Sequence, residues 1–233
     1  MVIGNGSIAN SFIKDYINDQ DILIFAAGVS NSNEINSYEF KREEQKLINS
    51  ILDNRDKKII YFSSAYVDII DTIYYKHKKS MENIIINNAK KYLIIRLPQI
   101  ASFSGNKNNL MNYLKNKIIK KEKIILYKNT FRSLIDIDDM VNIVNVISKK
   151  INNQIIIIYE IEPVNVVELT NKIGNIIGIE PIISMEEKKD KNFSLKNSEV
   201  INETIDYLKI NNNHYLDKLL KKYINGCDIS GIL

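Results

Sequence analysis

Short runs rich in β-branched residues alternate along the chain with longer stretches whose apolar residues recur with a helical period. The expected strands are Val2–Ile3, Ile22–Ala26, Lys58–Phe62, Tyr92–Arg96, Ile124–Tyr127, Leu134–Ile137 and Ile155–Glu160. The expected helices are Ser7–Ile17, Tyr38–Leu52, Tyr74–Lys90, Asn108–Lys120, Asp138–Lys149 and Val166–Ile177. This alternation predicts an α/β fold with a doubly wound parallel sheet that helices cover on both faces.

The pattern loosens after about residue 162. Pro163 and Pro181 flank the last of these helices, and the charged stretch Met185–Lys196 has little apolar content, which predicts a loop or a disordered segment. Asn211-Asn212-Asn213 separates two further helical stretches near the end of the chain. The chain therefore divides into a regular α/β part over residues 1–150 and a smaller C-terminal region over residues 151–233, interleaved with the first part.

Composition excludes several classes of protein. The 233 residues are 45% hydrophobic and 26% charged, as in a globular protein with a sizeable core. The 32 basic and 28 acidic residues are scattered, which disfavours a nucleic-acid-binding surface. No apolar run approaches the ~20 residues needed to cross a bilayer, so no membrane segment is expected. The single cysteine, Cys227, offers neither an internal disulfide nor a thiolate metal site, and we expect a cytoplasmic protein without a metal.

The first strand leads into Gly4-Asn5-Gly6-Ser7-Ile8-Ala9, which opens the first helix and has the form Gly-x-Gly-x-x-Ala. In such a loop the first glycine permits a tight turn, and the second lets the backbone approach a pyrophosphate. The N–H groups at the helix N-terminus and the helix dipole then favour the phosphates. A plain glycine-rich turn is the alternative. No acid follows the strand Ile22–Ala26, which ends in Ala27-Gly28, so the usual contact to an adenosine ribose is missing.

A second group of residues suggests proton-transfer chemistry. Tyr74 and Lys78 lie four residues apart, which places both side chains on one face of a helix. A lysine ammonium near a phenol favours the phenolate, and this makes Tyr74 a candidate proton donor or acceptor. Ser64, at the end of the preceding strand, could bond a substrate oxygen. Tyr75 and Lys79 have the same spacing, and chance occurrence is a real alternative in a chain with 13 tyrosines.

The loop at Gly4, the strand end Ala26-Ala27-Gly28, Ser63-Ser64, Tyr74-x-x-x-Lys78 and the segment Arg132–Asp139 occur in the order typical of one family. The chain resembles the extended short-chain dehydrogenase/reductases, in particular the NAD-dependent epimerase/dehydratase family that acts on nucleotide-activated sugars. The resemblance covers residues 1–150 well and the remainder loosely. Glu82, four residues after Lys78, favours the Tyr74/Lys78 register, because the family helix often reads Tyr-x-x-Ser-Lys-x-x-x-Glu.

The resemblance implies roles for individual residues. Ser64 would bond the reacting sugar oxygen, Tyr74 would pass the proton, and Lys78 would hold the nicotinamide ribose of NAD or NADP. Arg132 would bind the sugar-nucleotide diphosphate, with a salt bridge to Asp136 or Asp138 as the alternative. Further expected contacts to the cofactor come from Gly4, Asn5, Gly6, Ser7, Ile8, Ala26, Ala27 and Gly28.

Two other residues, Arg96 and His77, lie near these motifs. Arg96 would line the substrate site at the carboxyl edge of the sheet or, equally, anchor a loop. His77 is expected to be an exposed helix residue and not a base.

The chain also departs from the family pattern. Only Asn18–Asp21 fills the gap in which relatives carry two further strands and a helix, so the Rossmann-like sheet should be smaller by about two strands. The residues that choose between NAD and NADP are therefore absent.

The function implied is an NAD(P)-dependent reductase or epimerase of a nucleotide sugar, more narrowly a 4-keto reduction in the synthesis of surface-polysaccharide precursors. Residues 1–150 would then bind the dinucleotide and residues 151–233 the substrate, and a homodimer is left open. The alternative is a non-catalytic protein of the same fold that binds a dinucleotide or sugar nucleotide.

Overall fold

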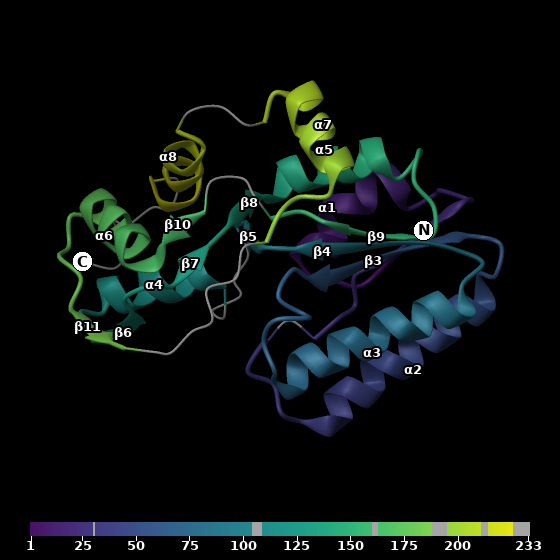
Figure 1. Ribbon diagram of the computed structural model, residues 1–233, viewed down its shortest axis with the longest axis horizontal. Coiled ribbons are helices and arrows are strands. Elements are labelled where there is room, and N and C mark those ends of the chain that lie inside the picture. Colours follow the sequence, from purple (N-terminus) through teal and green to yellow (C-terminus); the bar gives the residue numbers. More distant parts are fainter. Residues whose placement is uncertain (30, 104–108, 160–162, 188–194, 211–213, 226–233) are drawn as a thin grey trace. The chain divides into compact units, whose positions relative to one another are not determined.

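The computed structural model describes residues 1–29, 31–103, 109–159, 163–187, 195–210 and 214–225 (Figure 1). The strands are β1 (Val2–Ile3), β2 (Ile22–Phe25), β3 (Lys58–Ser64), β4 (Lys91–Leu97), β5 (Gln99–Ala101), β6 (Ile124–Tyr127), β7 (Phe131–Arg132), β8 (Leu134–Asp136), β9 (Gln154–Ile157), β10 (Val164–Asn165) and β11 (Ile183–Glu186). The helices are α1 (Ser7–Tyr16), α2 (Ser37–Asp53), α3 (Ile73–Asn88), α4 (Leu110–Ile119), α5 (Ile137–Ile147), α6 (Val166–Ile177), α7 (Glu199–Leu208) and α8 (Tyr215–Leu220), followed by the π-helical turn η1 (Lys221–Asn225).

The helices α1 to α6 begin and end within two residues of the expected ranges. Four short strands, β5, β7, β10 and β11, were not expected. Met185 and Glu186, placed in a loop by their charged surroundings, belong to β11, which pairs in parallel with β6. Cys227 and Asn211-Asn212-Asn213 lie outside the described residues.

The centre of the fold is a parallel sheet of five strands in the order β1-β2-β3-β4-β9. The longest pairing is that of β3 with β4, from Lys58 opposite Lys91 to Ser64 opposite Leu97. The predicted α/β fold with a parallel central sheet is thus confirmed. β1 is an edge strand, and no described strand pairs with its outer side.

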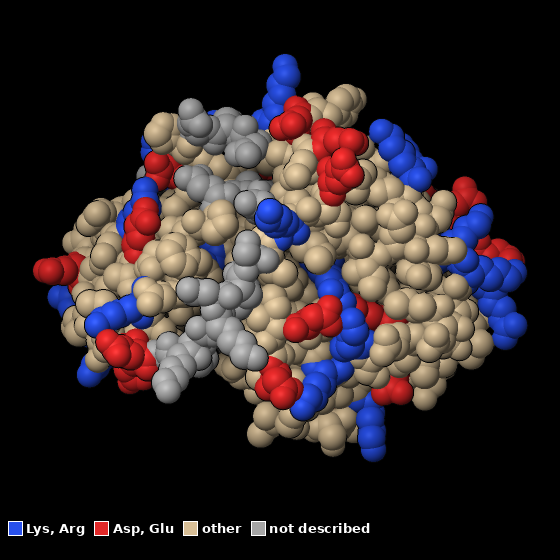
Figure 2. Space-filling model, in the orientation of Figure 1, with Lys and Arg blue, Asp and Glu red and all other residues tan. Residues whose placement is uncertain are grey.

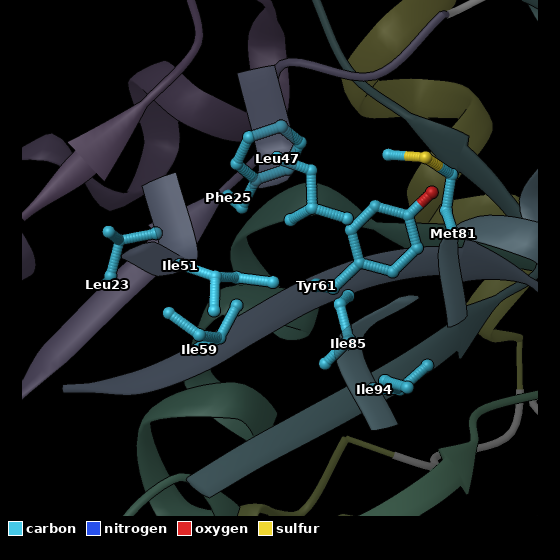
Figure 3. Packing of buried hydrophobic residues seen from close by; sticks show 9 residues of the cluster. All are labelled: Leu23, Phe25, Leu47, Ile51, Ile59, Tyr61, Met81, Ile85 and Ile94. Atoms are coloured by element: carbon cyan, nitrogen blue, oxygen red, sulfur yellow. The ribbon is translucent and has the colours of Figure 1, made fainter. Parts of the chain in front are cut away.

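Helices cover both faces of this sheet. On one face, side chains of β2 and β3 pack against α2 and α3 in a cluster that Figure 3 shows: Leu23, Phe25, Leu47, Ile51, Ile59, Tyr61, Met81, Ile85 and Ile94. Phe62 points to the opposite face, because side chains alternate along a strand, and it stacks on Phe12 of α1 with ring centroids 5.3 Å apart. α5 packs beside α1 on that second face (Figure 1).

The first two crossovers of the sheet have opposite hands. The order β1-β2-β3 runs in one direction with all strands parallel, yet α1 and α2 lie on opposite faces. Crossovers are right-handed in about 98% of cases, so one of this pair has the rare hand. This arrangement is expected if, as the resemblance to the family implies, two further strands after α1 would lie beyond β1 and the short connection Asn18–Asp21 stands in their place.

The short connection between α1 and β2 is closed by local hydrogen bonds. The carboxylate of Asp19 accepts the N–H groups of Asp21, at 2.8 Å, and Ile22, at 2.7 Å. This turn uses the side chain in place of a backbone acceptor. The terminal ammonium of Met1 donates to the carbonyls of Tyr16, Asp19 and Ile22, which ties β1 to the same turn. The chain thus enters β2 directly beside β1.

The chain forms two compact units. The first comprises residues 1–98, 137–159 and 195–208, and it holds the five-stranded sheet. The second comprises residues 99–136, 160–194 and 209–233, with three small two-stranded sheets and the helices α4, α6 and α8. The sequence suggested a region over residues 1–150 with a smaller one over residues 151–233 interleaved with it. In the structure the chain passes between the two units several times, because residues 99–136 are inserted after β4 and α5 returns to the first unit.

Basic and acidic side chains are intermingled on the face that Figure 2 draws. None of the described helices is both long and apolar enough to span a membrane.

Candidate active site

The turn between β1 and α1 depends on a glycine at position 4. Gly4 has a φ of +131°, and a Cβ built there would lie 2.4 Å from the carbonyl oxygen of Ala26. A residue with a side chain would therefore clash with the end of β2 and hold a strained backbone. Gly4 lets the loop pass directly against Ala26, whose N–H donates to the carbonyl of Ile3 at 2.8 Å.

The N-terminus of α1 is open. Gly6 is its N-cap, no side chain caps the helix, and the first turn carries no acidic residue. A Cβ built on Gly6 would meet no other atom within 4 Å. The first N–H groups of a helix have no partner within the helix, and together with the helix dipole they favour an anion. The loop thus has both features that a pyrophosphate needs, free donors and room for close approach.

Gly28, three residues after the end of β2, lies over the side chain of Lys78. A Cβ on Gly28 would come within 2.7 Å of the Lys78 Nζ and 3.0 Å of the Glu43 Oε1. The absence of a side chain at Gly28 therefore leaves room for a buried charge pair beneath the strand end. The structure brings Ala26-Ala27-Gly28, the loop at Gly4 and Lys78 together at the carboxyl edge of the sheet.

Tyr74 and Lys78 lie in the first two turns of α3. Thr72 caps this helix by accepting the N–H of Tyr75 at 3.4 Å. The Lys78 Nζ lies 5.8 Å from the centre of the Tyr74 ring. Lys79 points elsewhere, because its Nζ pairs with Asp68 at 2.9 Å and its side chain is 42% exposed. These contacts favour the register Tyr74/Lys78 over Tyr75/Lys79.

Lys78 is bonded to two buried partners. Its Nζ donates to the Glu43 Oε1 at 3.2 Å and to the Tyr61 hydroxyl at 3.1 Å, while Tyr61 donates to the same Oε1 at 3.2 Å. The Glu43 Oε2 accepts the N–H of Val29 at 2.8 Å and lies 3.1 Å from the His77 Nε2. We call Glu43, Tyr61, His77 and Lys78 the Glu43 cluster. All four residues are buried.

The prediction that His77 is exposed was wrong. Its side chain packs against Phe40 with ring centroids 4.6 Å apart, and its Nε2 faces Glu43. In the sequence, His77 has several lysines as neighbours, which is typical of the solvent-exposed face of a helix. In the fold, however, α2 covers this side of α3.

Electrostatics keep Glu43 and Lys78 ionised. Burial by itself would raise the pKa of Glu43, but the Lys78 ammonium, the His77 hydrogen bond and the Val29 N–H lower it to about 2. Burial would lower the pKa of Lys78, yet Tyr61 and the Glu43 carboxylate hold it above its usual value. Burial raises the pKa of Tyr61, which stays a neutral phenol. The cluster therefore holds a carboxylate, an ammonium and a phenol at neutral pH.

Sequence reasoning did not identify Glu43 or Tyr61. One signal for Glu43 was present, because it lies three residues after Phe40 and four before Leu47, on the apolar stripe of α2. An acid on such a stripe needs a buried partner, since an unpaired buried carboxylate is costly. Its partners come from β3 and α3, which only the folded chain brings to α2.

Ser64 is the last residue of β3, three positions after Tyr61. Its Oγ accepts the N–H of Tyr66 at 3.2 Å, and this contact leaves the hydroxyl hydrogen free to donate. The neighbouring Ser63 is buried, and its Oγ has no hydrogen-bond partner.

Arg96 is part of a buried ion pair. Its guanidinium donates to both carboxylate oxygens of Glu82, at 2.9 and 2.7 Å, and to Asp68 at 2.6 Å. The Arg96 side chain is 8% exposed and that of Glu82 is fully buried. These contacts hold β4 to α3 and to the turn after β3, so they support the anchoring role and give no support to the substrate-binding one.

Arg132 lies on β7 in the second unit. Its Nη1 donates to the carbonyl of Phe131 at 2.8 Å. The carboxylate of Asp136, one of the acids considered as its partner, accepts two bonds from the Lys222 Nζ, at 2.9 and 2.8 Å. Within the described part of the chain, no group of three or more His, Cys, Asp or Glu side chains could hold a metal ion.

Comparison with solved structures shows what this architecture is similar to. A dTDP-glucose 4,6-dehydratase from Bacillus anthracis, in complex with NAD, has a TM-score of 0.69 at 12% identity, over 95% of this chain and 77% of that one. A UDP-N-acetylglucosamine 4-epimerase from Methanobrevibacter ruminantium has a TM-score of 0.66 at 14% identity, over 88% and 76%. RMD from Pseudomonas aeruginosa, complexed with NADPH, has a TM-score of 0.66 at 12% identity, over 94% and 87%.

The chain has the fold of the extended short-chain dehydrogenase/reductases. No protein-family model matches its sequence, and no curated protein matches it either. This fold agrees with the resemblance noted from the sequence motifs, at 12–14% identity to the three structures.

The residues at the sheet edge fit the dinucleotide of this enzyme fold. A Cβ on Gly6, the N-cap of α1, would lie in open space, and the uncapped helix N-terminus suits a pyrophosphate. Lys78 and Tyr74 come from the first two turns of α3, and the Lys78 Nζ lies beneath Gly28.

Proposed function

We propose that the protein is an NAD(P)-dependent oxidoreductase or epimerase that acts on a nucleotide-activated sugar. The observation that carries this proposal is the position of Lys78, whose ammonium lies 5.8 Å from the centre of the Tyr74 ring and beneath Gly28 at the end of β2. The open α1 N-terminus at the same edge supports it. The similar structures named above include complexes with NAD and with NADPH.

The chemistry divides between the cofactor and the chain. A bound nicotinamide would supply the hydride acceptor or donor. The Tyr74 hydroxyl would give a proton to the substrate oxygen or take one from it, which is general acid–base catalysis. The Lys78 ammonium would stabilise the charge that develops on the phenol oxygen, and the Ser64 hydroxyl would donate to the substrate oxygen.

The narrower proposal is reduction of a 4-keto sugar nucleotide in the cytoplasm, as a step toward surface polysaccharides. Arg132 would bind the diphosphate of the substrate, because its planar guanidinium can donate two parallel hydrogen bonds to phosphate oxygens. The test is turnover of 4-keto sugar nucleotides by purified protein with NADH and with NADPH. Loss of cofactor absorbance that depends on the sugar would support a reductase. Interconversion of sugars without net cofactor loss would support an epimerase.

A second candidate is a non-catalytic protein that binds a dinucleotide or a sugar nucleotide. Two observations favour it: no described strand lies beyond β1 to carry a ribose-binding residue, and Glu43 and Tyr61 already engage Lys78. Binding measured by titration, with no turnover of any tested sugar nucleotide, would favour this function.

Replacing Gly6 with valine should abolish dinucleotide binding without loss of the fold. The new side chain would project into space that is open in the free protein, so it should clash only with a bound pyrophosphate. We expect affinity to fall by about a hundredfold or more, about 2.7 kcal/mol, with an unchanged melting temperature. Fluorescence titration with NADH and NADPH measures this loss. Gly6→Ala is the graded control, with a smaller expected effect. Unchanged affinity in Gly6→Val would show that the loop is a structural turn.

The protein should discriminate poorly between NAD and NADP. The chain after α1 turns at Asp19 directly into β2, and the residues that follow this strand, Ala26-Ala27-Gly28, offer neither an acid for the ribose hydroxyl nor an arginine for a 2′-phosphate. A lost charge-assisted hydrogen bond is worth ~1.5–3 kcal/mol, so either cofactor should bind about tenfold or more weakly than in enzymes that keep this unit. Isothermal titration with both cofactors tests this. A preference above about a hundredfold would contradict it.

A further inference from the structure

We propose that Glu43 is a positioning residue of the candidate site, which fixes the Lys78 ammonium at the end of β2 before any ligand binds. The effect of this residue on cofactor binding rests on the proposed function, whereas the contact between Glu43 and Lys78 does not. Glu43 belongs to α2, whereas Lys78 belongs to α3, and 35 positions separate them in the sequence. A carboxylate from a different helix therefore determines where the lysine ammonium can lie.

The surroundings of Glu43 hold its carboxylate in one orientation. One oxygen accepts from Lys78 and Tyr61, while the other accepts from the Val29 N–H and faces His77. The Glu43 side chain is 1% exposed. A buried carboxylate with all these partners has little freedom to rotate, since any rotation would leave a buried donor unpaired. Glu43 can thus fix the position of the lysine.

The same contacts limit what Lys78 can bind. An ammonium has three N–H groups, and two of them are directed to Glu43 and Tyr61. The third is the one left for a ligand or for the Tyr74 oxygen. The lysine side chain is 6% exposed, and Gly28 covers it closely enough that a single methyl group there would touch the Nζ. A cofactor would therefore meet a lysine that is already oriented, and would not have to order a mobile one.

The first arm of the test uses no cofactor. Acetic anhydride acetylates uncharged, accessible amines, and mass spectrometry of the digested protein gives the rate at each lysine. In the wild type, we expect Lys78 to react far more slowly than Lys76, whose side chain is 71% exposed. Glu43→Gln removes the charge at almost constant volume and should raise the Lys78 rate at least about tenfold, because the ammonium loses its carboxylate partner.

Two controls and a second variant make this arm specific. Tyr61→Phe removes a neutral partner from the same cluster and should change the Lys78 rate by less than about threefold, since the charge pair remains. Lys58 is an internal control for the fold, because its buried ammonium bonds the carbonyls of Ser148 and Ile151 in another part of the first unit. Gly28→Ala is the second variant if Glu43→Gln unfolds, since its methyl group would displace the Nζ from Glu43 and should also raise the Lys78 rate.

The second arm measures function. For Glu43→Gln, we expect the KM for the cofactor to rise about tenfold while kcat falls less, because Glu43 positions Lys78 and does not itself take part in the chemical step. A Lys78 rate that stays at the wild-type value in both Glu43→Gln and Gly28→Ala, with Lys58 protected, would overturn the inference. A wild type that neither binds nor turns over a dinucleotide would overturn the proposed function alone, because the labelling arm would still report whether Glu43 holds Lys78.

Discussion

Replacing Tyr74 with phenylalanine should lower turnover by about 10²–10⁴ while dinucleotide affinity changes no more than a few-fold. The phenol is assigned to proton transfer, and its ring, which contacts Tyr75 edge to face at 5.1 Å, is kept in the variant. Steady-state rates with a sugar nucleotide and fluorescence titration with NADH give the two quantities separately.

Tyr75→Phe is the matched control for this experiment. Tyr75 lies on the same helix turn, but its partner in the alternative register, Lys79, pairs with Asp68. The control should retain more than half of the wild-type rate. A large loss in Tyr75→Phe together with an active Tyr74→Phe would transfer the catalytic assignment to Tyr75.

Arg96→Met should destabilise the protein by about 3–5 kcal/mol, the cost typical of breaking a buried ion pair from one side. Glu82 is fully buried and would lose both hydrogen bonds to the guanidinium. The nearest remaining cation is Lys79, whose Nζ is 3.7 Å from Glu82. Urea denaturation measures the free energy of unfolding, and the double variant Arg96→Met/Glu82→Leu should recover much of the loss, since no unpaired charge is left.

Arg132→Met is the matched comparison for the stability loss expected in Arg96→Met. Arg132 is only partly buried, and its replacement should change the free energy of unfolding by about 1 kcal/mol or less. Its effect should instead appear in the KM for the sugar nucleotide. If Arg96→Met kept wild-type stability and lost affinity for the substrate, Arg96 would have the substrate-binding role expected from its place at the strand end.

Local patterns were sufficient for much of the fold. Each helix from α1 to α6 buries one apolar stripe, and each central strand is an apolar run, so periodicity located both kinds of element to within a few residues. The unexpected strands β7 and β10 are two residues long and pair with each other, which leaves too short a pattern to detect. The interruption of the first unit by residues 99–136 was also not evident, because an inserted segment carries the same kinds of helices and strands as its host.

The sequence by itself determined the parallel α/β architecture, the open loop at Gly6 and the helical spacing that puts Tyr74 beside Lys78. These follow from local geometry, since a turn or a single helix fixes distances between residues a few positions apart. Only the tertiary structure decided that Glu43 holds Lys78 and that Glu82 and Asp68 engage Arg96, in pairs 14 to 35 residues apart. Such contacts depend on which helix covers which face of the sheet. A charge buried beneath a helix then needs a partner of opposite charge, because an unpaired buried charge is costly.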